Sequence, residues 1–262
     1  MAAASRGSRT PTVQQAFVLH HYDWSESSQV LDLFTREQGR MAVVAKGAKR
    51  PYSQLRAVLL PFQRIQVALS KPLKREDEDA PEVVTLRSAE WAGGSVLPAG
   101  AALFSAYYLN ELLMKFLARQ DPHPALFDAY AATLARLHDG EDALAQAALR
   151  AFELRLLAEV GLLPELSLVT VTQQPLVAQR AYAISPESGV IEASNELANI
   201  DGATLVQLQA ALMHGSMAAL QQACLGALPA LKTALRGLLH YHLGHRPLRS
   251  RQVMLDLQRL QD

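Results

Sequence analysis

The sequence contains a single cysteine, Cys224, among 262 residues. One thiol forms no intramolecular disulfide and builds no cysteine-based zinc site, which is typical of proteins of the reducing cytoplasm. No stretch approaches the about 18 consecutive apolar residues of a membrane span, and residues 1–12 lack the apolar core of a secretory signal. We therefore expect a cytoplasmic protein without a membrane segment, and we interpret residues 1–12 as a flexible tail.

Sequence motifs of catalysis and nucleotide binding are also missing. The chain has no GxxxxGK[ST], GxGxxG or GxSxG pattern. The densest histidine group, His240, His242 and His245, has spacings that diverge on a helix, so no metal site is expected there. Cys224 lies in an alanine- and leucine-rich segment, where a buried thiol is more common than a nucleophile. We expect no enzyme, no metal and no cofactor, although a catalytic triad drawn from distant segments would not show in the sequence.

The formal net charge is zero, but the charges are segregated along the chain. Residues 1–75 hold twelve Lys/Arg against four Asp/Glu, a net charge of +8, whereas residues 92–200 hold six against twelve, a net charge of −6. The last 62 residues return to +3. Basic regions of this kind are typical of nucleic-acid binding, although solvated surface faces would give the same composition.

Hydrophobic periodicity divides the chain into two parts. Short β-rich runs fill residues 15–22, 29–35, 40–47, 62–70 and 82–91, and helical spacing begins at about residue 98. We predict an α+β multidomain protein, with a five-stranded barrel of the OB or SH3-like type over residues 13–92. A helical domain follows over 93–262, with an irregular insertion at about 162–200 that contains a hairpin around Ser188 and Gly189.

The stretch VVAKGAKRPYS places Lys46, Lys49 and Arg50 at the end of a predicted strand. Single-stranded nucleic acid is held on such barrels by cations that contact phosphates and by aromatic rings that stack on bases. We expect these three residues and Arg56 to contact phosphates, without reading sequence and with a strong salt dependence. For each aromatic candidate, core packing remains the alternative. The stacking candidates are Trp24, Tyr52, Tyr22 and Phe62.

The order of several motifs resembles the RecO family of bacterial recombination mediators. The similarity runs through AFVLHHYDWSES, LDLFT, VAKGA and LLPF to TLRSAE, YYLNELL, ALRAFELRLL and HLGHRPLRSR, and so covers nearly the whole chain in order. The VAKGA and LRxFE segments are the most specific. The resemblance implies an N-terminal OB-fold, a helical domain and a role in DNA repair and homologous recombination in the cytoplasm, in association with the nucleoid.

The resemblance also implies partners and contact residues. RecO proteins bind single- and double-stranded DNA, anneal complementary strands, work with RecR, and dock on the acidic C-terminal tail of single-stranded-DNA-binding protein, which helps to load RecA. Lys46, Lys49 and Arg50 then become DNA contacts. Arg150 matches an arginine that receives the tail, beside an apolar stripe that contains Leu149 and Phe152.

Two departures from the family pattern and one alternative remain. The insertion lacks the cysteine cluster with which some relatives bind zinc, so no metal is expected, and Ala151 stands where some relatives carry a second basic residue. Arg246, Arg249 and Arg251 could contact DNA or only cap a helix. The alternative function is a generic OB-fold protein that binds single-stranded nucleic acid, such as RNA, without mediator activity.

Overall fold

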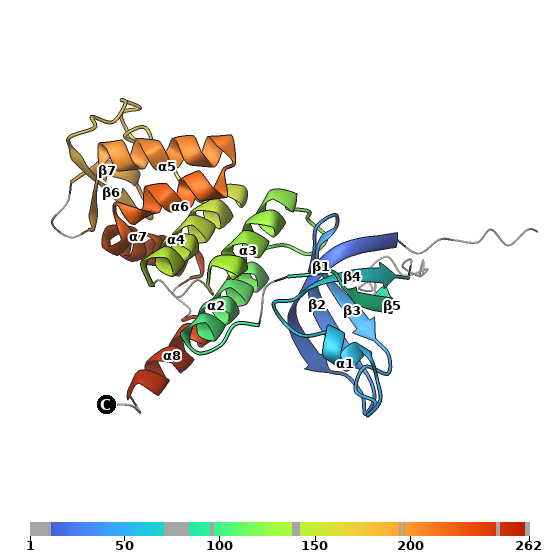
Figure 1. The fold of residues 1–262 in the computed structure, drawn as a ribbon. Helices are drawn as coiled ribbons and strands as arrows, with labels where there is room; N and C mark the ends of the chain where they lie inside the picture. Colours follow the sequence, from blue (N-terminus) through green and yellow to red (C-terminus); the bar gives the residue numbers. More distant parts are fainter. Residues whose placement is uncertain are drawn as a thin grey trace, which may run out of the picture. The chain divides into compact units, whose positions relative to one another are not determined.

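The structure is a computed structural model, and it describes residues 12–70, 84–94, 97–137, 142–193, 195, 197–244 and 247–259. It divides into two compact units (Figure 1). The first contains the chain up to residue 94 together with 118–122, and the second contains 95–117 and the chain from 123 onward. The predicted tail lies outside the described residues, except that Thr12 begins the first strand. Within the described part of the chain, no helix has the length and apolar character needed to cross a membrane.

Five strands of the first unit form a closed barrel, drawn in blue to teal in Figure 1. They are β1 (Thr12–Asp23), β2 (Gln29–Thr35), β3 (Gly39–Ala45), β4 (Arg64–Leu69) and β5 (Val84–Trp91). Their order is β1-β2-β3-β5-β4, with β3 and β5 parallel and the other pairs antiparallel. A parallel β3–β5 contact requires the chain to cross over, which is the Greek-key arrangement of the OB-fold. The predicted α+β class with an OB barrel is therefore confirmed.

The barrel interior is filled by alternate side chains from every strand. Val18, Leu31, Leu33, Val43 and Ile65 are all completely buried in this core. The register of β1 against β2 shifts between Val18 and His20, where a bulge re-aims the end of β1. One end of the barrel is covered by a short helix, α1 (Leu55–Val58), which was not predicted from the sequence.

Residues 118–122 return from the helical part of the chain and dock on β3. The amide of Gln120 donates to the carbonyl of Arg40 (2.8 Å), and Arg119 pairs with Arg40 in a parallel bridge. This contact depends on Gly39, whose φ is +70° and whose added Cβ would lie 1.9 Å from the carbonyl oxygen of Asp121. Only glycine fits that position without a shift of the backbone.

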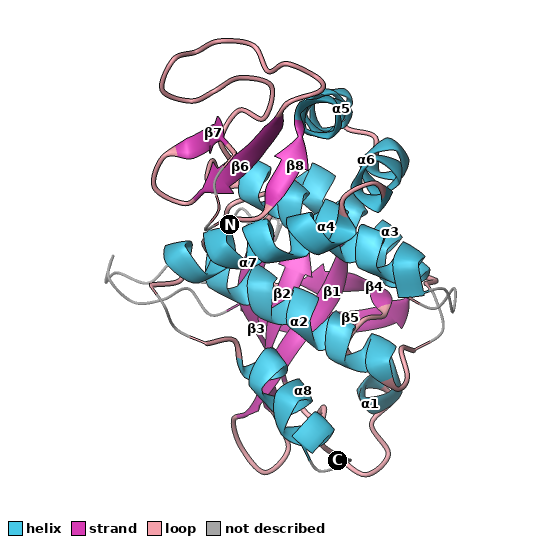
Figure 2. Ribbon diagram, turned by 90° about the vertical axis from the view of Figure 1, so that its left-hand side faces the viewer, coloured by secondary structure: helices cyan, strands magenta, loops and turns pink. Residues whose placement is uncertain are grey.

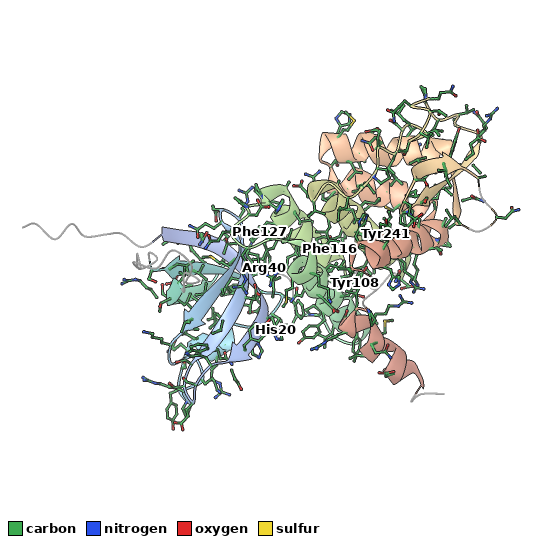
Figure 3. The ribbon with its side chains drawn as sticks, turned by 180° about the vertical axis from the view of Figure 1, so that it is seen from behind. His20, Arg40, Tyr108, Phe116, Phe127 and Tyr241 are labelled. Atoms are coloured by element: carbon green, nitrogen blue, oxygen red, sulfur yellow. The ribbon has the colours of Figure 1, made fainter. Side chains whose placement is uncertain are left out.

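A buried carboxylate stabilises the same region of the barrel, where residues 118–122 contact β3. Arg40, labelled in Figure 3, donates from Nε and Nη2 to the two carboxylate oxygens of Asp32, both at 2.9 Å. The Nη2 atom of Arg119 lies 3.7 Å from the same carboxylate. Because Asp32 is buried, this bidentate pairing satisfies a charge that would otherwise be costly.

Among the described residues, the second unit consists mainly of seven helices. They are α2 (Ala101–Phe116), α3 (Pro124–Arg136), α4 (Asp142–Glu159), α5 (Gly202–His214), α6 (Met217–Leu225), α7 (Leu228–His242) and α8 (Arg249–Arg259). Helix α4 packs against α3, α6 and α7. Its middle, from Ala147 to Leu154, is buried on all sides. The central position of α4 therefore removes polar as well as apolar side chains from solvent.

The region predicted as an irregular insertion contains a three-stranded sheet, beside α5 and α7 in Figure 2. Its strands are β6 (Ala181–Ser185), β7 (Gly189–Glu192) and β8 (Asn199–Asp201), in the order β7-β6-β8. The predicted hairpin is present, with Ser185 opposite Gly189. The hydroxyl of Tyr182 accepts from the amide of Val177 (2.9 Å), so packing and hydrogen bonds hold this region together.

Candidate functional site

The structure brings the YDWSES turn and the basic loop together at one end of the barrel. The turn connects β1 to β2, and the basic loop follows β3. The amide of Lys49 donates to the carbonyl of Ser27 (3.0 Å), and its Nζ donates to the carbonyl of Ser25 (3.1 Å). Within the turn, the Ser25 hydroxyl accepts from the amide of Ser28 (3.2 Å). The YDWSES turn and the basic loop, which are distant in the sequence, thus form one surface.

The residues predicted to contact phosphates lie around this surface, but they differ in exposure and in whether they already have a partner within the protein. Lys46, Arg50 and Arg56 are exposed. Lys49 is 3.2 Å from the carboxylate of Asp23, in addition to its backbone contacts. That ion pair is at the surface and contributes little, at most about 1 kcal/mol. A phosphate can therefore compete with Asp23 for the lysine.

The predicted stacking groups fall into two classes. Trp24 is 70% exposed and Tyr52 is 99% exposed, so both rings are available to a base. Tyr22 is partly exposed, and its ring contacts that of His20 edge-on. Phe62 is buried, at 6% exposure, so the hypothesis that it stacks on bases is wrong. Core packing accounts for Phe62, whereas it does not account for Trp24 and Tyr52.

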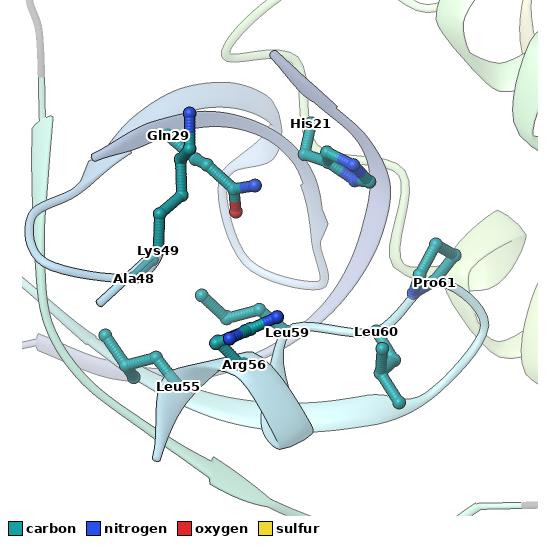
Figure 4. A pocket seen from close by; sticks show the side chains of 9 residues that line it. All are labelled: His21, Gln29, Ala48, Lys49, Leu55, Arg56, Leu59, Leu60 and Pro61. Atoms are coloured by element: carbon teal, nitrogen blue, oxygen red, sulfur yellow. The ribbon is translucent and has the colours of Figure 1, made fainter. Parts of the chain in front are cut away.

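A pocket of about 340 Å³ opens at the same end of the barrel (Figure 4). Lys49 and Arg56 supply cationic groups to its lining, His21 supplies an imidazole and Gln29 supplies a side-chain amide. The remaining wall is apolar. It consists of Ala48, Leu55, Leu59, Leu60 and Pro61.

A second candidate site surrounds Arg150 on α4 of the helical unit. The Nη2 atom of Arg150 lies 2.7 Å from Oε1 of Glu153, and the hydroxyl of Tyr108 on α2, labelled in Figure 3, donates to the same oxygen (2.6 Å). Arg150 and Glu153 are both buried. Burial raises the pKa of Glu153, while the Arg150 charge and the Tyr108 hydrogen bond lower it in part. Within the part of the chain that the structure describes, Arg150 Nε and Glu153 Oε2 have no hydrogen-bond partner.

Cations from α7 and α8 lie near this buried pair. Two of them, Lys232 and Arg236, were not predicted from the sequence. Lys232, Arg236 and Arg251 are exposed. Partial burial and the charges of Arg251 and Arg150 lower the pKa of Arg236, which shows that like charges gather here. The spacing of four residues between Lys232 and Arg236 could have indicated a cationic helix face, because it places both side chains on one face of a helix.

The structure also places the other residues predicted to contact the tail. Leu149 and Phe152 are buried, at 5% and 0% exposure, and the Phe152 ring packs against Tyr130. They can support the helix that carries Arg150, but as placed they offer little surface to a peptide. The backbone amide of Arg249 donates to a carboxylate oxygen of Glu111, which caps α8 (2.9 Å). Arg246 lies outside the described residues.

The histidines that the structure describes and the cysteine do not form a cluster suited to a metal. Among the described residues, no group of three or more His, Cys, Asp or Glu side chains could hold a metal ion. Cys224 is buried, and burial raises the pKa of its thiol to about 12. A thiol held in this protonated form is a poor nucleophile.

Comparison with known proteins gives a consistent result along the chain. Residues 10–80 match the family model described as Recombination protein O N terminal, and residues 98–252 match Recombination protein O C terminal. A protein named DNA repair protein RecO from Polaromonas naphthalenivorans is 51% identical over 94% of this chain and 97% of its own length. The protein of the same name from Variovorax paradoxus is 50% identical over 99% of this chain and all of its own length.

Proposed function

The chain belongs to the RecO family of DNA repair and recombination proteins, and we propose that it binds and anneals single-stranded DNA as a recombination mediator. In this role it acts on strands covered by single-stranded-DNA-binding protein, called the coating protein below, and assists RecA loading together with RecR. It also binds double-stranded DNA through the same phosphate contacts. The proposal includes no bond-making chemistry, since annealing requires only that the charges of two strands are neutralised.

The observation that carries the proposal is the exposed surface at the end of the barrel. Lys46, Arg50 and Arg56 are free to contact phosphates, and Trp24 and Tyr52 are free to stack on bases. This combination of cations and exposed aromatic rings is the usual basis of binding to single strands without sequence preference. Lys46, Arg50 and Tyr52 lie between β3 and α1, Arg56 lies in α1, and Trp24 lies in the turn between β1 and β2, so all five belong to the barrel unit.

The cations around Arg150 support contact with the acidic C-terminal tail of the coating protein. Arg236, Arg251 and Lys232 are exposed, and the guanidinium of the buried Arg150 is held by Glu153. Guanidinium groups bind carboxylates with two parallel hydrogen bonds, which suits a free chain terminus. Because Arg150 itself is almost fully buried, the exposed cations make the first contact and Arg150 completes the site.

An annealing assay with complementary strands tests both sites. We expect Lys46→Glu/Arg50→Glu to anneal neither bare nor coated strands, because it reverses two phosphate contacts. Arg236→Glu/Arg251→Glu should anneal bare strands at the normal rate and fail on coated ones. The matched control is Arg87→Glu/Arg180→Glu, which makes the same change in charge at two exposed positions away from both sites.

The same assay separates the mediator from a generic nucleic-acid binder. A generic OB-fold protein would anneal bare strands and fail on coated strands even in its wild-type form. Wild-type annealing of coated strands supports the mediator role if the Arg236→Glu/Arg251→Glu variant loses it and still anneals bare strands. Equal activity of all three variants would contradict both assignments.

A further inference from the structure

At one mouth of the barrel, two polar residues occupy strand positions that face inward: His21, which is exposed, and Gln29, which is half-buried. His21 pairs with Leu31, and Gln29 pairs with Ala45 in the β2–β3 register. Leu31 and Ala45 are completely buried members of the barrel core. Since directly paired residues point to the same face of a sheet, His21 and Gln29 occupy inward positions where Val18 and Leu31 continue the core. Polar residues at positions where the strand pattern calls for apolar ones are common at functional sites.

These two side chains line the 340 Å³ pocket together with apolar side chains that include Leu55, Leu59 and Leu60. In Figure 4, the amide of Gln29 and the guanidinium of Arg56 point toward the pocket from opposite sides, with His21 beside them. Leu59 forms part of both the pocket wall and the barrel core. The mouth of a β-barrel with an apolar wall and a few convergent polar groups is a typical site for a small ligand.

The size and lining of the pocket select among ligands. The pocket volume is near the lower end of the about 300–1,000 Å³ range of small-molecule sites. The pocket therefore holds one compact chemical group and not a chain of several linked units. A phosphate alone would leave the wall of Leu55, Leu59 and Leu60 without a partner. A planar heterocycle would cover that wall, while an amide can bind its polar edge and an imidazole can stack on its face.

We infer that this pocket receives one unstacked nucleobase of a bound strand, with Lys49 and Arg56 at its adjacent phosphates. Gln29 binds the polar edge of the base, His21 lies against it, and the leucine wall covers the other side. The inference rests on the proposed function, because it names a subsite of the same DNA-binding surface. A base inside a duplex is stacked and paired, so entry costs least from a single strand. The pocket thereby favours single-stranded over double-stranded DNA, which phosphate contacts alone do not.

The test compares two oligonucleotides with the same number of phosphates. One consists entirely of abasic sites, and the other carries a single thymine at its centre. Because one base held by stacking is worth about 1–3 kcal/mol, we expect the wild-type protein to bind the single-thymine strand about tenfold more tightly. His21→Ala and Gln29→Leu should each lose most of this preference and keep the affinity for the abasic strand.

Matched variants guard against indirect effects. His20→Ala changes the neighbouring histidine, which pairs with Asp32 outside the barrel core, and Gln66→Leu changes an exposed glutamine on β4. Both should keep the tenfold preference. Trp24→Ala tests the competing site, because loss of the preference in this variant would place the single thymine on the exposed ring and not in the pocket.

The outcomes distinguish this inference from the function on which it rests. Binding of both oligonucleotides with equal affinity by the wild type would overturn the base pocket and leave DNA binding through phosphates intact. A preference that survives in both His21→Ala and Gln29→Leu would also overturn it, and its loss in Trp24→Ala would assign the base to that ring. If the wild type binds neither these strands nor an ordinary single strand, the proposed function itself is wrong.

Discussion

Replacing Arg150 by methionine removes the cation from a buried ion pair, and we expect this to destabilise the helical unit strongly. The Arg150 side chain is 9% exposed and that of Glu153 is 0% exposed, with 2.7 Å between Nη2 and Oε1. In the variant, the Glu153 carboxylate keeps only the hydrogen bond from Tyr108. Breaking a buried pair in this way costs about 3–5 kcal/mol, because one charge stays buried without compensation.

Urea unfolding followed by circular dichroism at 222 nm measures this cost, since the helices dominate that signal. The double variant Arg150→Met/Glu153→Gln removes the stranded charge and keeps an acceptor for the Tyr108 hydroxyl. We expect the double variant to regain most of the stability that Arg150→Met loses. A loss below about 1 kcal/mol in the single variant, or additive effects of the two substitutions, would refute the reasoning.

This prediction bears on how the tail-binding site is tested. If Arg150→Met destabilises the fold, its failure on coated strands would not identify a contact with the tail. Arg236 and Arg251 are exposed, so their substitution changes the surface charge with little effect on folding. They are therefore the better probes of the site.

Three further perturbations have defined outcomes. Burial raises the folded-state pKa of Glu153 above 4.5. The contribution of Glu153 to the free energy of unfolding should therefore be full below about pH 4.5 and decline as the pH rises through the folded-state pKa. Urea unfolding at several pH values should show a smaller decline of stability with pH in Glu153→Gln. Gly39→Ala should cost more than about 2 kcal/mol in urea unfolding, whereas Gly215→Ala, at φ +69° with nothing within 4 Å, should cost only about 1 kcal/mol. Glu111→Ala removes the carboxylate that accepts two backbone amides at the start of α8, so amide exchange in α8 should become several-fold faster, while Lys115→Ala should leave it unchanged.

The barrel could be predicted from the sequence because its strands are short, apolar and alternating. The expected strands at residues 29–35 and 82–91 differ from β2 and β5 by at most two residues at either end. The docking of residues 118–122 on β3 could not be predicted, because it depends on a long-range contact at Gly39 and has no local pattern. The same holds for α1, whose four residues are too few to show helical periodicity.

The candidate sites were only partly predictable for a related reason. Exposure of Trp24 and Tyr52, and burial of Phe62, follow from how the loops fold back on the barrel, and the types of these residues do not reveal it. Arg150 was expected beside an apolar stripe, but α4 is enclosed by other helices, which buries the arginine and requires Glu153 as its partner. Arg236 and Arg251 come from separate helices, so only the folded chain brings their charges together.

The salt dependence of single-strand binding tests the central claim most directly. Each phosphate contact on a single strand contributes about −0.7 to the slope of log K against log salt concentration. We predict that Lys46→Gln/Arg50→Gln/Arg56→Gln makes the slope about 2 units less steep than in the wild type, while Arg87→Gln/Arg180→Gln leaves it unchanged. An unchanged slope in the triple variant would show that the end of the barrel does not hold the DNA.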